Sequence, residues 1–201
     1  RLLGNMSLGI GEHLAEIINA LATQPQLEEL LLIGLNVGTT ECAALSTLMH
    51  STARLQELNL NNNIIDDEGA DVLAGALTNS NLRALDFTNN LGVTVDGMSS
   101  FSKVLCDTSS ITSTYLSNHT LESLGVGLEN IPADLKALLA LNKSSEDKKH
   151  VAMKKILKHH QHFDMQPFFE WDLKVLPLAV DWFERARSID DTDEAILVKH
   201  K

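Results

Sequence analysis

Residues able to perform catalysis or bind metal are few in this chain of 201 residues and rarely stand at suitable spacings. The tightest histidine cluster is His159-His160-x-His162, but adjacent residues on a helix point about 100° apart and seldom share one metal ion. Asp66-Asp67-Glu68 stands where a helix is expected to begin, and carboxylates there interact favourably with the helix dipole. The sequence has no phosphate-binding glycine loop, no H-E-x-x-H pair and no G-x-S-x-G elbow. We therefore predict no enzyme activity, no cofactor and no metal site.

The two cysteines, Cys42 and Cys106, fall in helix-like segments that lie far apart in the sequence. We interpret them as buried thiols in a reducing compartment, because their pattern supports neither a disulfide framework nor a thiolate nucleophile. Hydrophobic residues make up 44% of the chain, which is enough for a core, yet no stretch is long enough to span a membrane. These features predict an intracellular protein, cytoplasmic or nuclear.

A leucine pattern recurs about every 28 residues and predicts how the chain is organised. It consists of Leu27-x-x-Leu30-x-Leu32, then Leu55-x-x-Leu58-x-Leu60, then Leu82-x-x-Leu85-x-Phe87. Each copy of this pattern, called a ladder below, places alternate side chains on one side of a short strand. A helical pattern such as that of residues 68–77 follows each ladder. One strand and one helix cannot bury their apolar faces alone, so neighbouring units must stack. The pattern predicts an α/β solenoid with a parallel sheet on its concave side and helices on its convex side.

The run at 55–70, Leu-Gln-Glu-Leu-Asn-Leu-Asn-Asn-Asn-Ile-Ile-Asp-Asp-Glu-Gly-Ala, resembles a leucine-rich repeat of the ribonuclease-inhibitor type. The resemblance covers about the first two thirds of the chain. In that family the asparagine matched here by Asn63 turns inward and hydrogen-bonds open backbone groups at the end of the strand. Asn90 and Asn5 match the same position, whereas Leu35 stands there in the first full repeat. Because the chain opens on half a ladder, we expect an N-terminally incomplete array.

A fourth repeat is irregular. Leu121-x-x-Leu124-x-Val126 is the preferred register, because the polar residues before it echo those before Leu82, and Ile111-x-x-Thr114-x-Leu116 is the alternative. The preferred register makes residues 91–120 an expanded connection. We therefore divide the chain into a repeat array at 1–130, a helical C-terminal cap at 131–187 and an acidic, flexible tail at 188–201.

Beyond residue 130 the sequence predicts helices, one starting near Pro132, one at about 146–161 and one at 173–187. Six of the nine aromatic residues fall in 163–183, and this segment resembles a C-terminal tail of leucine-rich-repeat proteins of unicellular algae. Large aromatics can close the end of an array, or they can anchor a protein partner. Both interpretations of this segment stay open.

Charge is distributed unevenly along the chain. Residues 1–130 carry 15 acidic and 4 basic side chains, whereas residues 131–201 carry 12 of each. An acidic region argues against nucleic-acid binding, which needs a positive field. The basic helix at 148–160 is interpreted as a solvated outer face, and the alternatives are docking against the acidic region, an acidic partner or anionic lipid.

Residues between the ladder positions are expected to point out of the concave sheet and to form a binding surface. Glu29 and Glu57 should lie beside each other, as should Asn59 and Asp86, and like charges held close favour a basic or amide-rich protein segment as partner. The alternative is an acidic face that only aids solubility. The predicted protein-binding residues are Glu28, Glu29, Gln56, Glu57, Asn59, Asn61, Arg83, Asp86, Thr88 and Glu122.

The sequence thus favours a non-enzymatic scaffold that binds a protein partner through its concave face, with the aromatic C-terminal segment as a second contact. The resemblance also implies an alternative, a GTPase-activating regulator, because a family with this repeat type activates a small nuclear GTPase. That role needs polar residues on the repeat rim, and no arginine lies between Arg1 and Arg54. The third hypothesis is a structural subunit of a larger assembly.

Overall fold

The computed structural model describes residues 2–4, 13–125, 131–145 and 147–160. The contacts divide the chain into two compact units, Arg1–Ala152 and Met153–Lys201, and each is considered by itself. Several sequence-based predictions lie outside the described residues: Asn5, Val126, His162, the helix at 173–187, the aromatic segment at 163–183 and the acidic tail at 188–201.

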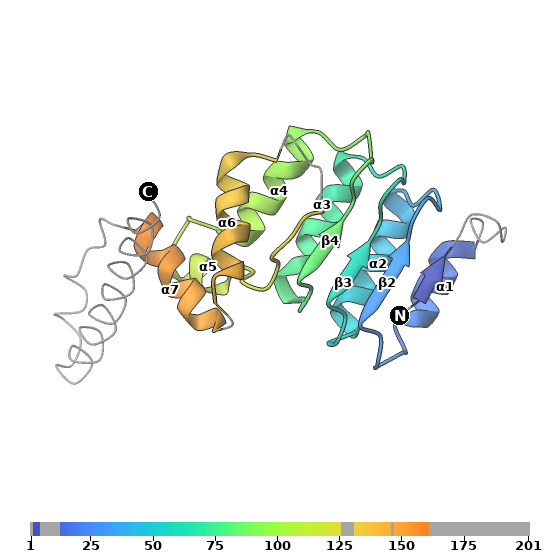
Figure 1. The fold of residues 1–201 in the computed structure, drawn as a ribbon, viewed down its shortest axis with the longest axis horizontal. Helices are drawn as coiled ribbons and strands as arrows, with labels where there is room; N and C mark the ends of the chain where they lie inside the picture. Colours follow the sequence, from blue (N-terminus) through green and yellow to red (C-terminus); the bar gives the residue numbers. More distant parts are fainter. Residues whose placement is uncertain (1, 5–12, 126–130, 146, 161–201) are drawn as a thin grey trace, which may run out of the picture. The chain divides into compact units, whose positions relative to one another are not determined.

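Four short parallel strands form one sheet in the order β1-β2-β3-β4 (Figure 1). Each strand is separated from the next by a helix, which is why neighbouring strands run parallel. The register aligns Leu30, Leu58 and Leu85 as neighbours across three strands. The strands are β1 (Leu2–Gly4), β2 (Glu29–Leu32), β3 (Glu57–Asn59) and β4 (Ala84–Asp86).

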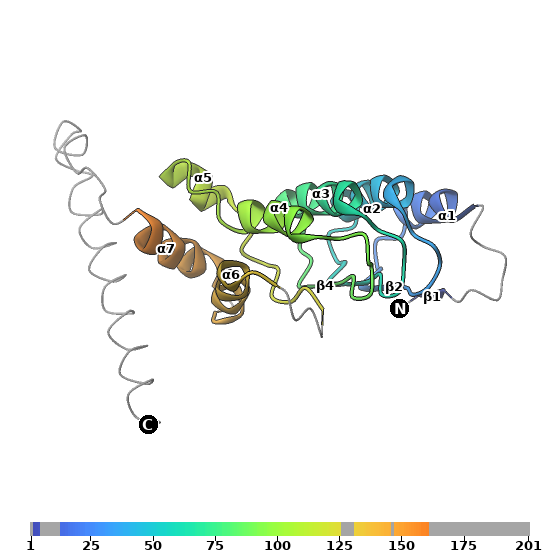
Figure 2. The same cartoon turned by 90° about the horizontal axis from the view of Figure 1, so that it is seen from above.

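Helices make up most of the described chain. The first four form a layer along one face of the sheet, and neighbours in this layer pack together (Figure 2). The sixth packs on the fourth, and the seventh crosses the boundary between the two units. They are α1 (Leu14–Leu21), α2 (Thr39–Ser51), α3 (Asp67–Ala76) with the 3-10 turn η3 (Leu77–Asn79), α4 (Val95–Leu105), α5 (Ile111–Leu116), α6 (Ala133–Lys143) and α7 (Lys148–His159).

The hydrophobic core lies between the helix layer and the sheet. The strand leucines Leu30, Leu58 and Leu85 are at most 1% exposed. Phe87 and Phe101 stack with their ring centroids 5.4 Å apart, which joins the end of β4 to α4. Because each strand leucine is flanked by residues pointing the other way, the opposite face of the sheet carries the polar side chains.

Two asparagines, Asn63 and Asn90, are buried where strands end, and each is bonded to backbone groups. The Oδ1 atom of Asn63 accepts hydrogen bonds from the backbone N–H groups of Leu35 (2.8 Å) and Val37 (3.0 Å), and its Nδ2 donates to the carbonyl of Leu32 (2.7 Å). Asn90 repeats the arrangement at the end of the next strand, where its Oδ1 accepts from the N–H of Ile65 (2.9 Å). These amides satisfy backbone groups that the short strands leave open.

The acidic triplet at 66–68 caps and links helices. Asp66 is the N-cap of α3: it accepts from the N–H of Gly69 (2.9 Å) and from the hydroxyl of Thr39 (3.0 Å) at the start of α2. Asp67 accepts from the backbone N–H groups of Thr94 (2.7 Å) and Gly97 (3.1 Å) at the start of α4. The two carboxylates therefore tie the N-terminal ends of three successive helices together.

The structure corrects the predicted fold class. The described chain is mostly helical, with seven α-helices and a small sheet, and it does not form the predicted leucine-rich-repeat solenoid. Among the described residues the sheet ends at β4, and the fourth ladder contributes one isolated bridge, between Ala84 and Ser123, but no strand. The alternative register at residues 111–116 is helix α5, where the Thr114 hydroxyl donates to the carbonyl of Asp107 (2.7 Å).

Helix α6 contacts the segment that follows β4. Nδ2 of Asn142 on α6 donates to the carbonyl of Leu121 (2.7 Å). Helix α6 also packs on α4. The keywords that follow from a solenoid, leucine-rich repeat and ribonuclease-inhibitor-like, are corrected with it. The helices expected after Pro132 and at about 146–161 are present as α6 and α7.

Replacing Asn63 by alanine should lower the free energy of unfolding by about 2–4 kcal/mol, because two buried N–H groups lose their acceptor. The control is Asn81→Ala, an exposed asparagine with a single hydrogen bond, to the carbonyl of Ala53 (3.0 Å), and it should change stability by about 0.5 kcal/mol or less. Urea denaturation of both variants measures the difference. Equal losses would show that the buried amide contributes no more than a surface one.

Stability should fall in acid through Asp66 and Asp67. The hydrogen bond from Gly69 lowers the pKa of Asp66 below its ordinary value, and the hydrogen bonds from Thr94 do the same for Asp67. A lowered folded-state pKa stabilises the fold above the unfolded value of about 4, and this contribution is lost as pH falls through the folded value.

Urea midpoints between about pH 6 and about pH 3 should therefore decline more steeply for the unaltered chain than for Asp66→Asn/Asp67→Asn. Asp134→Asn, at an exposed position in the first turn of α6, is the matched control and should keep the steep decline. A control slope as shallow as that of the double variant would contradict the assignment.

Candidate functional site

The face of the sheet that points away from the helix layer is the candidate site, and it consists of ordered rows. The register places Glu29 beside Glu57, and Leu31 beside Asn59 and then Asp86. Neighbouring parallel strands lie about 4.8 Å apart, so the two glutamates of the first row are close neighbours. Glu57 is exposed and Glu29 is half-buried.

A second row precedes the strands. The carbonyl of Glu28 accepts from the N–H of Gln56 (2.9 Å), that of Gln56 accepts from Arg83 (2.8 Å), and that of Arg83 accepts from Glu122 (2.8 Å). Asn61 and Thr88 extend the open face beyond the strand ends. All ten residues predicted to bind a partner therefore lie on this face or along the edge where the strands begin. Their binding role stays a prediction.

Polar side chains on the face are held by local bonds. Oδ1 of Asn59 accepts from the N–H of Asn61 (3.0 Å), and Oδ1 of Asp86 accepts from the N–H (2.9 Å) and the hydroxyl (2.6 Å) of Thr88. Gly125 covers the end of this row with a backbone φ of 98°, and a Cβ there would come within 2.5 Å of the Asp86 carboxylate. Glycine is needed at 125 because a larger residue would displace the aspartate.

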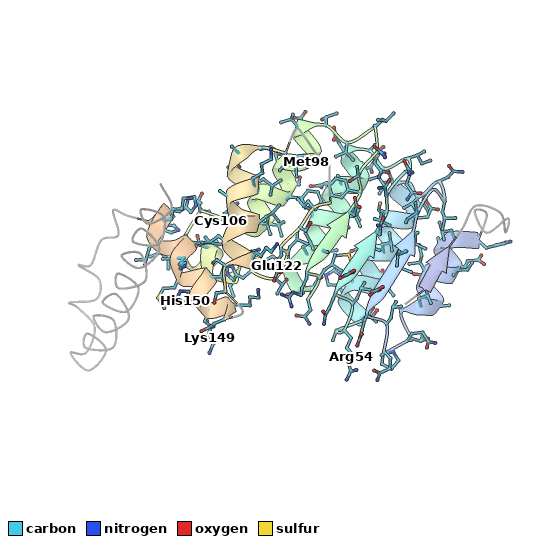
Figure 3. The ribbon with its side chains drawn as sticks, viewed as in Figure 1. Arg54, Met98, Cys106, Glu122, Lys149 and His150 are labelled. Atoms are coloured by element: carbon cyan, nitrogen blue, oxygen red, sulfur yellow. The ribbon has the colours of Figure 1, made fainter. Side chains whose placement is uncertain are left out.

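One end of the face carries an ion-pair network around Glu122, a residue that is labelled in Figure 3. Arg83 donates from Nε and from a terminal nitrogen to the two carboxylate oxygens (3.1 Å each), and Nζ of Lys148 lies 3.3 Å from Oε1. Lys148 also donates to the carbonyls of Asn142 (3.2 Å) and Ser145 (3.3 Å), so it joins the end of α6 to the sheet. The Glu122 side chain is only 15% exposed, which limits solvent screening.

A hollow of about 290 Å³ lies beside this network. Sequence reasoning found four of the residues that line it but missed the other three, Ala84, Ser123 and Lys143, and it also missed Lys148, which completes the network. A lysine at a helix end is common, and only the folded chain shows that this one reaches Glu122. The hollow is lined by Gln56, Glu57, Arg83, Ala84, Glu122, Ser123 and Lys143.

The two cysteines lie inside the fold. Cys42 and Cys106 are buried, and burial raises the pKa of the Cys42 thiol to about 12, so little thiolate forms there at neutral pH. Partial burial, together with the charge of Lys158, lowers the pKa of His159. Among the described residues no group of three or more histidine, cysteine, aspartate or glutamate side chains is placed to hold a metal ion.

The basic helix differs from the solvated face that the sequence predicts. Arg54 is exposed at the end of the sheet opposite Met98 (Figure 3) and donates to Gln26 (2.6 Å). On α7, Lys149 is exposed but Lys155 is fully buried, so the basic helix is not a uniformly solvated face. In the part of the chain that the structure describes, no helix combines the length and apolar character needed to cross a bilayer.

Neither a protein-family model nor a curated protein matches this sequence. Among solved structures, Leiomodin-1 Actin-Binding Site 2 (ABS2) is similar, with a TM-score of 0.58 and 20% sequence identity. The match covers 80% of this chain and 88% of that chain. At this identity the likeness concerns the fold alone.

Removing the charge of Glu122 should destabilise the chain, because Arg83 and Lys148 then lose their shared partner. We expect Glu122→Gln to lower the free energy of unfolding by about 1–2 kcal/mol, between the values typical of exposed and of buried ion pairs. The control Glu28→Gln removes an equal charge from an exposed position and should change stability by about 0.5 kcal/mol or less. Thermal unfolding in low and high salt measures both, and equal shifts would contradict a structural role for the network.

Proposed function

We propose that this chain is a non-enzymatic protein-interaction module whose contact surface is the open face of its sheet. The observation that supports the proposal is the pairing of Glu29 with Glu57 in one row of the parallel sheet. The register sets the two glutamates on neighbouring strands, and one cationic or amide-bearing side chain can contact both carboxylates. The face therefore suits a basic or amide-rich protein segment.

Asn59 and Asp86 continue the recognition surface in the next row. Their side chains accept hydrogen bonds from backbone groups two residues later, so their orientation is set before a partner arrives. Pre-set polar groups lose less conformational freedom on binding, which favours selective contacts. The Arg83–Glu122–Lys148 network bounds the face at one end and adds positive charge there.

Actin is the first partner to test, because the solved structure that matches this fold is named as an actin-binding site. The likeness supports a protein partner without specifying the contact residues. The sheet face indicates which residues should make the contact: Glu29 and Glu57 should be required for binding, whereas acidic residues elsewhere should not.

The experiment measures binding of actin, and of a synthetic peptide of alternating lysine and asparagine, to the full chain. Charge reversal in Glu29→Lys/Glu57→Lys should weaken binding at least tenfold, or about 1.4 kcal/mol. Glu16→Lys/Asp134→Lys changes the net charge equally at two exposed positions off the sheet and serves as the control. The proposal fails if the unaltered chain binds neither probe, or if both double variants bind equally well.

A further inference from the structure

Three large apolar side chains are exposed at the edge of the sheet where strands lead into helices. Ile64 and Val95 are each 64% exposed, and Leu91 is 93% exposed. We name Ile64, Leu91 and Val95 the apolar rim. Isolated exposed leucines are common on protein surfaces, but neighbouring ones mark interaction sites.

The loops that carry the rim lie side by side. The N–H of Asn62 donates to the carbonyl of Thr88 (3.0 Å), and the side chain of Asn89 donates to that of Asn62 (3.0 Å). Two residues beyond Ile64, Asp66 forms a β-bridge with Gly92, the residue after Leu91. Figure 1 shows these strand-to-helix loops along one edge of the sheet, at the top of the view.

Ile64 and Leu91 occupy the same place in successive loops. Ile64 directly follows the buried Asn63, and Leu91 directly follows the buried Asn90. Both side chains are exposed at this position, so the repeated loop sets them on the same edge of the sheet.

The loop is also closely held. A Cβ on Gly92 would lie 2.9 Å from the carbonyl oxygen of Ile65, so Gly92 is needed for this close approach. The rim residue next to it therefore stands on a fixed backbone.

The surroundings of the rim are uniformly acidic. The three loops with the helix starts that follow them, at 33–41, 61–71 and 88–97, contain no lysine or arginine. They contain six carboxylates, of which Asp66, Glu68 and Asp96 are exposed within a few residues of rim side chains. An apolar surface bordered only by negative charge complements an apolar side chain flanked by positive charge.

We propose that the apolar rim anchors a protein segment carrying a large apolar side chain flanked by lysines or arginines. The inference rests on the proposed function and extends it: the sheet face selects charge, and the rim supplies apolar burial. Covering an exposed leucine removes apolar surface from water, which favours association.

The test uses two synthetic peptides as probes, one alternating leucine with lysine and one with serine in place of each leucine. Fluorescence anisotropy measures the Kd of each for the full chain. The leucine peptide should bind at least tenfold more tightly, and Leu91→Ser/Val95→Ser should remove most of that advantage. Because both side chains are exposed, the substitutions should leave the urea midpoint unchanged.

Leu116→Ser/Tyr115→Ser is the matched control, since these residues of α5 are 64% and 49% exposed away from the rim. Equal binding of the two peptides, or an equal loss in the control, would overturn the proposal. Concentration-dependent dimerisation that Leu91→Ser abolishes would also overturn it, because a second copy would then occupy the rim. If Glu29→Lys/Glu57→Lys abolishes actin binding while Leu91→Ser/Val95→Ser has no effect on either probe, the proposed function stands and the rim assignment fails.

Discussion

The structure depends on backbone groups that very short strands leave without partners. Strands of three or four residues form few ladder hydrogen bonds, and the chain must then turn sharply into a helix. The buried amide of Asn63 meets this need by bonding the exit of β2 and the exit of β3 at once. Asn90 does the same between β3 and β4. These bonds fix the spacing of successive strand-and-helix units. The arrangement of the open sheet face and of the apolar rim follows from that spacing.

The open face and the apolar rim are two consequences of the same spacing. Once neighbouring turns are aligned, every second strand residue reaches the face opposite the helices, and Glu29 and Glu57 become neighbours. The same alignment sets the loops beside one another, with Ile64 and Leu91 exposed directly after the buried asparagines. A partner that contacts both would meet charge on the face and apolar surface at the edge, which combines selectivity with binding energy.

The end of the sheet is defined by electrostatics and side-chain hydrogen bonds. Glu122 brings together Arg83 from the sheet edge and Lys148 from the segment after α6. Asn142 of α6 donates to the carbonyl of Leu121 beside this network. Helices α6 and α7 follow, as the sequence predicts beyond residue 130.

The sequence by itself determined which side chains are buried and which face outward around the first three ladders, because residue alternation and a period of about 28 residues are local properties. It also located the adjacent glutamates and the inward-facing Asn63. Extending the ladder to a solenoid was wrong, because residues 111–116 form helix α5 and the described part of the fourth ladder forms one isolated bridge and no strand. Only the tertiary structure decided where the sheet ends, which lysine reaches Glu122 and that Leu91 is left in solvent. Each of these results from contacts between residues distant in the chain, whose energies no local spacing encodes.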